Sequence, residues 1–225
     1  MKEKPNEWVS ISDLMAGVMA VIMLMLVVSV LQNKAGEAAA KAQQQMQELA
    51  RSQGNAAQQA RVQSLLTDMQ ADLERTGEAQ LVEIDIANRR LTLPDDAFAR
   101  GSACITPATR TVLGKLSVRV ATFMTESAQA QVLVEGHTDN LAVNRPVTDF
   151  ARYCTVYDDN YTLSAARARE ARKLLVQALD AQQALRVGVA GYGDSRPKPG
   201  IDPASALNRR VEIQLVVGRQ VTAEL

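Results

Sequence analysis

The residue with the clearest potential for chemistry is Asp13, which directly precedes an uncharged run over residues 14–31. A membrane anchor needs only apolar residues, and a charge at the bilayer centre costs roughly 2.5–3.5 kcal/mol, with a lower cost near the interface. A carboxyl packed against partner helices, with little access to water, could bind and release a proton. The alternative is an interfacial acid near Trp8 that caps a helix start, where the helix dipole favours negative charge.

The uncharged run has Ser29 as its one polar residue and is long enough to cross a bilayer core, which takes about 18 apolar residues or more. The alternative, a cleaved signal peptide, usually has an apolar core of about 7–15 residues followed by small residues at the cleavage site. We therefore predict a transmembrane helix over residues 9–31 after a short cytoplasmic segment, residues 1–8. The lysines on its two sides do not decide its orientation.

Few residues are suited to catalysis or metal binding. The chain has two cysteines, Cys104 and Cys154, and one histidine, His137, whereas a structural zinc site needs four ligands. In a periplasmic domain the cysteines could form a disulfide, and the alternative is two unpaired thiols. The sequence shows no catalytic triad or phosphate loop, and its 25 basic and 25 acidic side chains cancel. We expect no enzyme, no bound cofactor and no direct nucleic-acid binding.

Residues 32–78 predict a helical stalk. The segment is rich in Ala, Gln, Glu, Lys and Arg, and it contains no aromatic residue and no proline. Such a composition favours a helix but cannot build a core of its own. Apolar side chains recur at helical spacing at Val62, Leu65, Leu66, Met69 and Leu73. We expect this part to form a coiled coil with a second copy of the chain, and a flexible linker is the alternative.

Residues 79–220 predict one α/β domain. The apolar pattern indicates a β-hairpin over residues 80–94, a helix that begins at Thr106-Pro107, and a second helix over residues 164–181. Further strands are expected at residues 131–136, 185–190 and 210–217. Strands that alternate with amphipathic helices favour an α/β sandwich with the helices on one face of the sheet.

Three motifs in this domain resemble the OmpA-like family. They are FARGSA at residues 98–103, VEGHTDN at 134–140 with NYTLSAARA at 160–168, and GYGDSRP at 191–197 with NRRVEI at 208–213. The resemblance covers nearly all of residues 80–218. It implies an OmpA-like α+β sandwich that binds peptidoglycan, whose stem peptides carry diaminopimelate, with an ammonium and a carboxylate on one carbon.

The resemblance also implies a binding site. Asp139 would take the ammonium, and Arg167 would take the carboxylate with bidentate geometry. Asn160 and Thr138 would add polar contacts, and Arg209 would add a second basic group. Taken alone, Asp139 could be only a helix cap and Arg167 only a solvated helix residue.

The chain departs from the family between Asp139 and Asn160, where 20 residues form a longer connection than is usual. This insert contains Cys154, so a disulfide to Cys104 would hold it in place. The insert could narrow the site, change its specificity or block it.

The apolar helix resembles that of MotB-type stator subunits. Asp13 is followed by a Met- and Ala-rich helix, and small residues at Ala16, Gly17 and Ala20 would let partner helices approach closely. The resemblance implies that Asp13 binds the coupling proton. The short N-terminus, smooth stalk and insert resemble the B subunit of the Zorya anti-phage defence system. The partners would be a polytopic MotA-like ring (the Zorya A subunit), a second copy and peptidoglycan.

Other functions stay open. A flagellar-type stator shares the same helix and domain, and a passive tether between the inner membrane and the wall needs no ion chemistry. Energy transducers of the TolR or ExbD kind share a helix with an aspartate, but they carry a different periplasmic domain. In each case we expect a bacterial inner-membrane protein with a cytoplasmic N-terminus and a periplasmic C-terminal domain.

Overall fold

The structure is a computed structural model that describes residues 7–217, without the side chains of residues 7–13 and of some residues between 31 and 53. The last part of the predicted domain, residues 218–220, lies outside the described residues. The chain divides into two compact units, Met1–Gly54 and Asn55–Leu225, and each has its own description.

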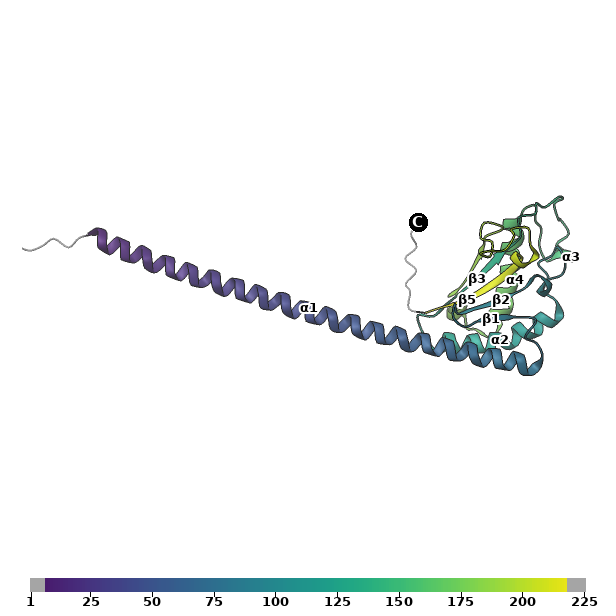
Figure 1. The fold of residues 1–225 in the computed structure, drawn as a ribbon, viewed down its shortest axis with the longest axis horizontal. Coiled ribbons are helices and arrows are strands. Elements are labelled where there is room, and N and C mark those ends of the chain that lie inside the picture. The colour runs from purple at the N-terminus through teal and green to yellow at the C-terminus, as the bar shows by residue number, and fades with distance from the viewer. Residues whose placement is uncertain (1–6, 218–225) are drawn as a thin grey trace, which may run out of the picture. The chain divides into compact units, whose positions relative to one another are not determined.

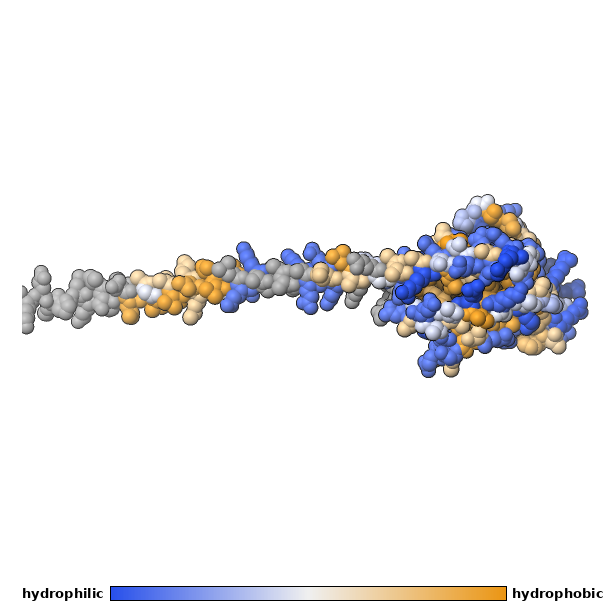
Figure 2. All heavy atoms as spheres, turned by 90° about the horizontal axis from the view of Figure 1, so that it is seen from below, coloured by the Kyte–Doolittle hydropathy of each residue, from blue (hydrophilic) through white to orange (hydrophobic). Residues whose placement is uncertain are grey.

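The described part of the first unit belongs to helix α1 (Glu7–Thr76). Within it, Leu14–Lys34 is 21 residues long with a mean hydropathy of 2.8, so it is long and apolar enough to cross a membrane. Figure 2 shows this segment as a mainly hydrophobic surface. The predicted N-terminal apolar helix is thus present as a candidate membrane span. The backbone of Asp13 lies in α1, but its side chain lies outside the described residues.

The second unit is a five-stranded sheet with helices packed against it (Figure 1). The strands follow the order β1-β2-β5-β3-β4. Their bounds are β1 Glu83–Asp85, β2 Arg90–Leu93, β3 Gln131–His137, β4 Val187–Gly191 and β5 Arg210–Val216. The β3–β4 pair is parallel and the other pairs are antiparallel. This mixed sheet agrees with the predicted α/β sandwich.

Two long helices of this unit form much of its helical layer. Helix α4 (Asn160–Leu175) packs on β3 and β4, and α2 (Pro107–Glu126) packs beside α4. Shorter helical segments connect the main elements: η1 Asp95–Ala97, α3 Phe150–Tyr153, η2 Val176–Ala178, α5 Ala181–Ala184 and η3 Ala206–Asn208.

Two glycines allow α4 to lie close to the sheet. A Cβ atom at Gly136 of β3 would lie 1.9 Å from the carbonyl oxygen of Ser164, and one at Gly191 of β4 would lie 2.6 Å from Ala165. Any larger residue at either position would push α4 away from the strand ends. The start of α4 is therefore fixed directly above the ends of β3 and β4.

The end of α1 differs from the predicted coiled coil. Four members of the apolar stripe, Val62, Leu66, Met69 and Leu73, are buried in the core of the chain's own domain, and Leu65 packs against that core. The stripe contacts the domain because burial of these side chains stabilises the fold without a second chain. The compact unit consequently begins at Asn55.

The second predicted helix also differs at both ends. It was expected over residues 164–181, whereas α4 begins at Asn160, because the Asp159 side chain accepts a hydrogen bond of 2.6 Å from the backbone N–H of Thr162. Beyond α4, Asp180 forms a capping box with Gln183 that starts the separate helix α5. The next strand, β4, begins two residues later than residue 185 for this reason.

Candidate functional site

A groove of about 1000 Å³ lies in the second unit, beside the ends of strands β2 and β5. Charged side chains from three separate segments line it, namely Asp95 of η1, Arg167 of α4 and Arg209 before β5. The insert contributes Leu141, and the loop before α2 contributes Phe98. Polar and apolar walls converge here, as in the ligand sites of many proteins.

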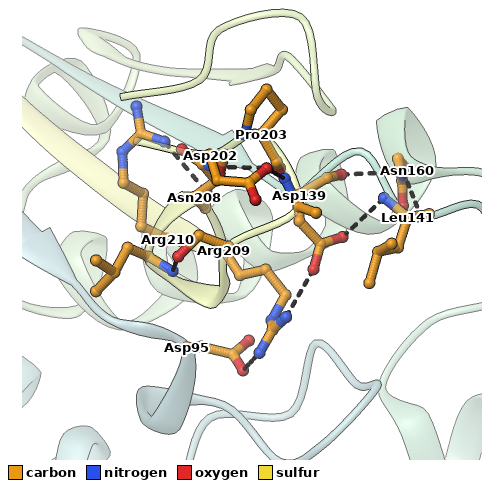
Figure 3. Close-up of polar contacts among 12 residues, drawn as sticks. Asp95, Asp139, Leu141, Asn160, Asp202, Pro203, Asn208, Arg209 and Arg210 are labelled. Carbon is orange, nitrogen blue, oxygen red and sulfur yellow. Dashed lines mark hydrogen bonds and ion pairs between the residues drawn. The ribbon is translucent and has the colours of Figure 1, made fainter. Parts of the chain in front are cut away.

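Three of these lining side chains, together with the buried Asp139, form one continuous charged network. Arg209 Nη1 donates to Asp139 Oδ2 at 2.6 Å, and Arg209 Nη2 lies 2.9 Å from Asp95 Oδ2 (Figure 3). The other oxygen of Asp95 accepts a hydrogen bond of 3.1 Å from Arg167 Nη1. The order is therefore Asp139–Arg209–Asp95–Arg167, with two acids and two bases in alternation.

Arg167 is the most deeply buried member of the network, with 2% of the side chain exposed. Its Nε donates to the carbonyl oxygen of Ser102 at 2.9 Å, and its guanidinium lies 5.0 Å from the centre of the Phe98 ring. Burial lowers the pKa of Arg167 below its ordinary value, and the neighbouring Asp95 opposes this change. A guanidinium so enclosed depends on fixed acceptors for its position.

Arg209 is the more accessible base, with 30% of its side chain exposed. Its hydrogen bond to Asp95, together with that to Asp139, raises the pKa of Arg209 above its ordinary value. Arg209 therefore remains a cation under all physiological conditions and presents part of its guanidinium to the groove.

The two predicted polar residues have different surroundings. Asn160 Nδ2 donates to the carbonyl oxygens of Asp139 (3.2 Å) and Leu141 (2.9 Å), so it holds the backbone that carries Asp139. Thr138 is buried, and its N–H donates to the carbonyl oxygen of Gly193. Its Oγ1 atom has no hydrogen-bond partner among the described residues. Asn160 therefore acts on the backbone of Asp139, and the Thr138 hydroxyl is buried beside it.

The structure brings three of the predicted site residues, Asp139, Arg167 and Arg209, into one network. Asp139 and Arg167 belong to one network, but they are joined through Arg209 and Asp95 instead of facing each other directly. Asp95 was missed. Its only signal in the sequence is an acid just beyond the LTL strand, comparable with Asp139 beyond β3. An exposed-looking Asp-Asp pair gives no indication that one of its members bridges two arginines.

The insert, residues 140–159, borders the groove. Cys154 at the end of α3 is joined to Cys104 by a disulfide. Leu141, Ala142 and Asn144 of the insert line the groove. The insert therefore forms part of the wall of the groove.

A second buried polar cluster lies on β3 and β5. Glu135, His137 and Glu212 bring potential metal-ligand atoms within 4.8 Å of one another. Glu212 already accepts a hydrogen bond of 2.6 Å from Arg210 Nε and lies 2.7 Å from Arg90 Nη1. Two guanidinium groups at one carboxylate repel a further cation, so the cluster is better suited to structure than to metal binding. His137 is buried at the end of β3.

Comparison with known proteins identifies the family. Residues 97–210, just over half of the chain, match the model of the OmpA family. This chain belongs to the OmpA family. A putative MotB-like protein from Desulfovibrio vulgaris has the same fold, with 20% identity, a TM-score of 0.52, and coverage of 72% of this chain and 97% of that chain.

Two further structures are similar to this OmpA-family chain. The cell wall anchor of the T6SS from Pseudomonas aeruginosa is 32% identical, with a TM-score of 0.45 and coverage of 66% of this chain and 94% of that chain. The periplasmic domain of Helicobacter pylori MotB is 19% identical, with a TM-score of 0.43 and coverage of 59% and 78%. No curated protein matches the chain at a comparable level.

Proposed function

We propose that the OmpA-family domain binds peptidoglycan through the Asp139–Arg209–Asp95–Arg167 network. The observation that carries this proposal is the alternation of acids and bases in a network whose members Asp95, Arg209 and Arg167 line one open groove, with the buried Asp139 bonded to Arg209 behind them. A diaminopimelate residue carries an ammonium and a carboxylate on one carbon. Asp139 would accept the ammonium, and the exposed face of Arg209 would be the first to meet the carboxylate. Arg167 would contribute when Asp95 moves from between the two guanidinium groups.

Wall binding can be tested with purified sacculi. The full chain in detergent is sedimented with sacculi, and the fraction bound is compared for wild type and Asp139→Asn. We expect the variant to bind at least tenfold more weakly, since it loses the carboxylate but keeps the shape of the side chain. Asp158→Asn, on the insert, is the matched control. Equal binding by Asp139→Asn and wild type would reject this site.

We further propose a single-pass inner-membrane protein with a cytoplasmic N-terminus and a periplasmic domain. The candidate span Leu14–Lys34 and the OmpA-family domain both fit this arrangement. The Cys104–Cys154 disulfide supports the orientation, because such bonds persist in the periplasm and are rare in the cytoplasm.

The most specific form of the proposal is a MotB-like stator B subunit of a Zorya-type anti-phage system, because the short N-terminus, the smooth stalk and the insert resemble that subunit. In this proposal Asp13 binds the coupling proton, a polytopic MotA-like subunit forms a ring around two copies of this chain, and the domain fixes the pair to the wall. The support is the acid at the head of the apolar helix and the OmpA-family domain on the same chain. A stator subunit of the flagellar motor is the alternative, and it would use the same mechanism for motility.

A passive tether is the second candidate, since every described feature would also serve a protein that only links membrane and wall. Asp13→Asn separates the two functions. In a stator, the variant should still co-purify with a multi-helix partner but lose activity in a phage-protection or motility assay. Ser12→Ala is the matched control. A normal phenotype for Asp13→Asn, with no multi-helix partner in the membrane pull-down, would favour the tether.

A further inference from the structure

The insert is attached to one particular loop of the domain. This loop, residues 99–104, precedes α2. Besides the Cys104–Cys154 disulfide, Ala103 N donates to the carbonyl oxygen of Tyr153 at 3.0 Å, and Ser102 Oγ donates to the same oxygen at 2.9 Å. A further link is the Tyr157 hydroxyl, which donates to the carbonyl oxygen of Gly101 at 2.6 Å. Four links therefore join two segments that lie about 50 residues apart in the sequence.

The same loop holds the buried base of the groove. The carbonyl oxygen of Ser102 accepts the hydrogen bond from Arg167 Nε. Ser102 is thus bound on two sides, with its hydroxyl on the insert and its carbonyl on Arg167. Gly101 has a positive φ of 64°, a conformation that non-glycine residues rarely adopt. The turn of the loop at this position therefore depends on glycine. A displacement of the insert would therefore also displace the Ser102 carbonyl oxygen that accepts the hydrogen bond from Arg167.

We infer that the Cys104–Cys154 disulfide is a positioning element of the binding site and acts through Ser102 on Arg167. This inference rests on the proposed binding of peptidoglycan. The disulfide keeps the insert against the 99–104 loop, the loop keeps the Ser102 carbonyl in line with Arg167 Nε, and the guanidinium keeps its place at the groove. Loss of the bond loosens this acceptor, and the ligand carboxylate meets a displaced base.

The test measures binding of the full chain in detergent to purified sacculi, with and without a phosphine reductant. We expect about tenfold weaker binding after reduction, and the same loss in Cys104→Ser/Cys154→Ser, because one charge-assisted hydrogen bond is weakened. Circular dichroism of each sample establishes that the domain is still folded. Equal affinity of a folded, reduced domain and the oxidised domain would overturn the inference.

A second background separates positioning of Arg167 from a general structural role. Arg167→Lys keeps the positive charge but lacks the Nε–H that donates to Ser102. If the disulfide acts through Arg167, reduction should not change binding further in Arg167→Lys, as in a double-mutant cycle. A further tenfold loss on reduction in this background would show that the disulfide acts by another route and would overturn the inference.

A third variant keeps the test decisive if the cysteine variants do not fold. Tyr157→Phe removes the hydroxyl bonded to Gly101 and leaves the disulfide intact, and we expect a loss of about threefold. The matched control is Tyr153→Phe, because the Tyr153 hydroxyl has no hydrogen bond among the described residues. Equal binding by the two variants would overturn the inference.

Failure of the inference can be distinguished from failure of the proposed function. If the wild-type chain does not bind sacculi, the proposed function fails as well. If binding depends on Asp139 but not on the disulfide or Tyr157, only the positioning role is rejected.

Discussion

Replacement of Asp95 by asparagine is the sharpest test of the charge network. Asp95 is the only carboxylate paired with Arg167 among the described residues, and it also pairs with Arg209. The side chain of asparagine has nearly the same shape, so the change removes charge with little loss of packing. The four charges of the network sum to zero in the wild type, with two acids and two bases, and to +1 in the variant. Arg209 keeps Asp139, whereas Arg167 is left without an acid.

The size of the effect follows from the exposure of the two partners. Removal of one member of a fully buried ion pair costs about 3–5 kcal/mol, and an exposed pair contributes about 0.2–1 kcal/mol. Arg167 is 2% exposed and Asp95 is 33% exposed, so the pair lies between these limits. The hydrogen bond from Arg167 to Ser102 is retained. We expect Asp95→Asn to lower the free energy of unfolding of the domain by about 2 kcal/mol.

The assay is urea unfolding followed by near-ultraviolet circular dichroism of tyrosine. All four tyrosines lie in residues 153–192, and a Trp8→Phe background removes the single tryptophan beside the apolar segment, so the tyrosine signal reports on the domain. Asp96→Asn is the matched control, because Asp96 is exposed and forms no ion pair within residues 7–217, and we expect a change below about 0.5 kcal/mol. Equal unfolding free energies for the Asp95 and Asp96 variants would refute the reasoning.

Three further predictions concern single residues. Arg209→Ala should weaken sacculus binding at least tenfold, and unchanged binding would exclude Arg209 from the site. Burial lowers the pKa of His137 from 6.5 to about 4. As the pH falls, His137 is therefore protonated in the unfolded state before it is protonated in the folded state. The free energy of unfolding should therefore fall by about 3 kcal/mol as the pH drops from 6.5 to 4. His137→Phe should lose this slope in urea titrations. Gly136→Ala should melt at a much lower temperature, because its Cβ would meet the Ser164 carbonyl, whereas Gly114→Ala on α2 should not.

The order of elements was predictable because local pattern dominates it. The alternation around the hairpin, the Thr-Pro start of α2 and the apolar strands at 131–137 and 210–216 all have the predicted type. Helix ends were less accurate, since the capping side chains of Asp159 and Asp180 set them through single hydrogen bonds. The spacing of apolar residues contains no information about such hydrogen bonds.

The apolar stripe near the end of α1 shows a different limit. The helical spacing was predicted correctly, but the stripe packs against the chain's own domain instead of a second copy of the chain. Val62, Leu66, Met69 and Leu73 pack into the domain, because a helix face gains the same burial energy from any apolar surface. Spacing specifies that a face must be covered and leaves open what covers it.

The sequence by itself determined the apolar helix with its leading acid, the OmpA-family motifs, the α/β class and the two arginines, Arg167 and Arg209, that line one groove. Each depends on residue type and local spacing. Only the tertiary structure decided that Asp95 stands between Arg167 and Arg209, and that the insert is bound to the loop that holds Arg167. These contacts join segments about 50 to 110 residues apart, and pairing at such distances is set by how whole elements pack, which no local pattern contains.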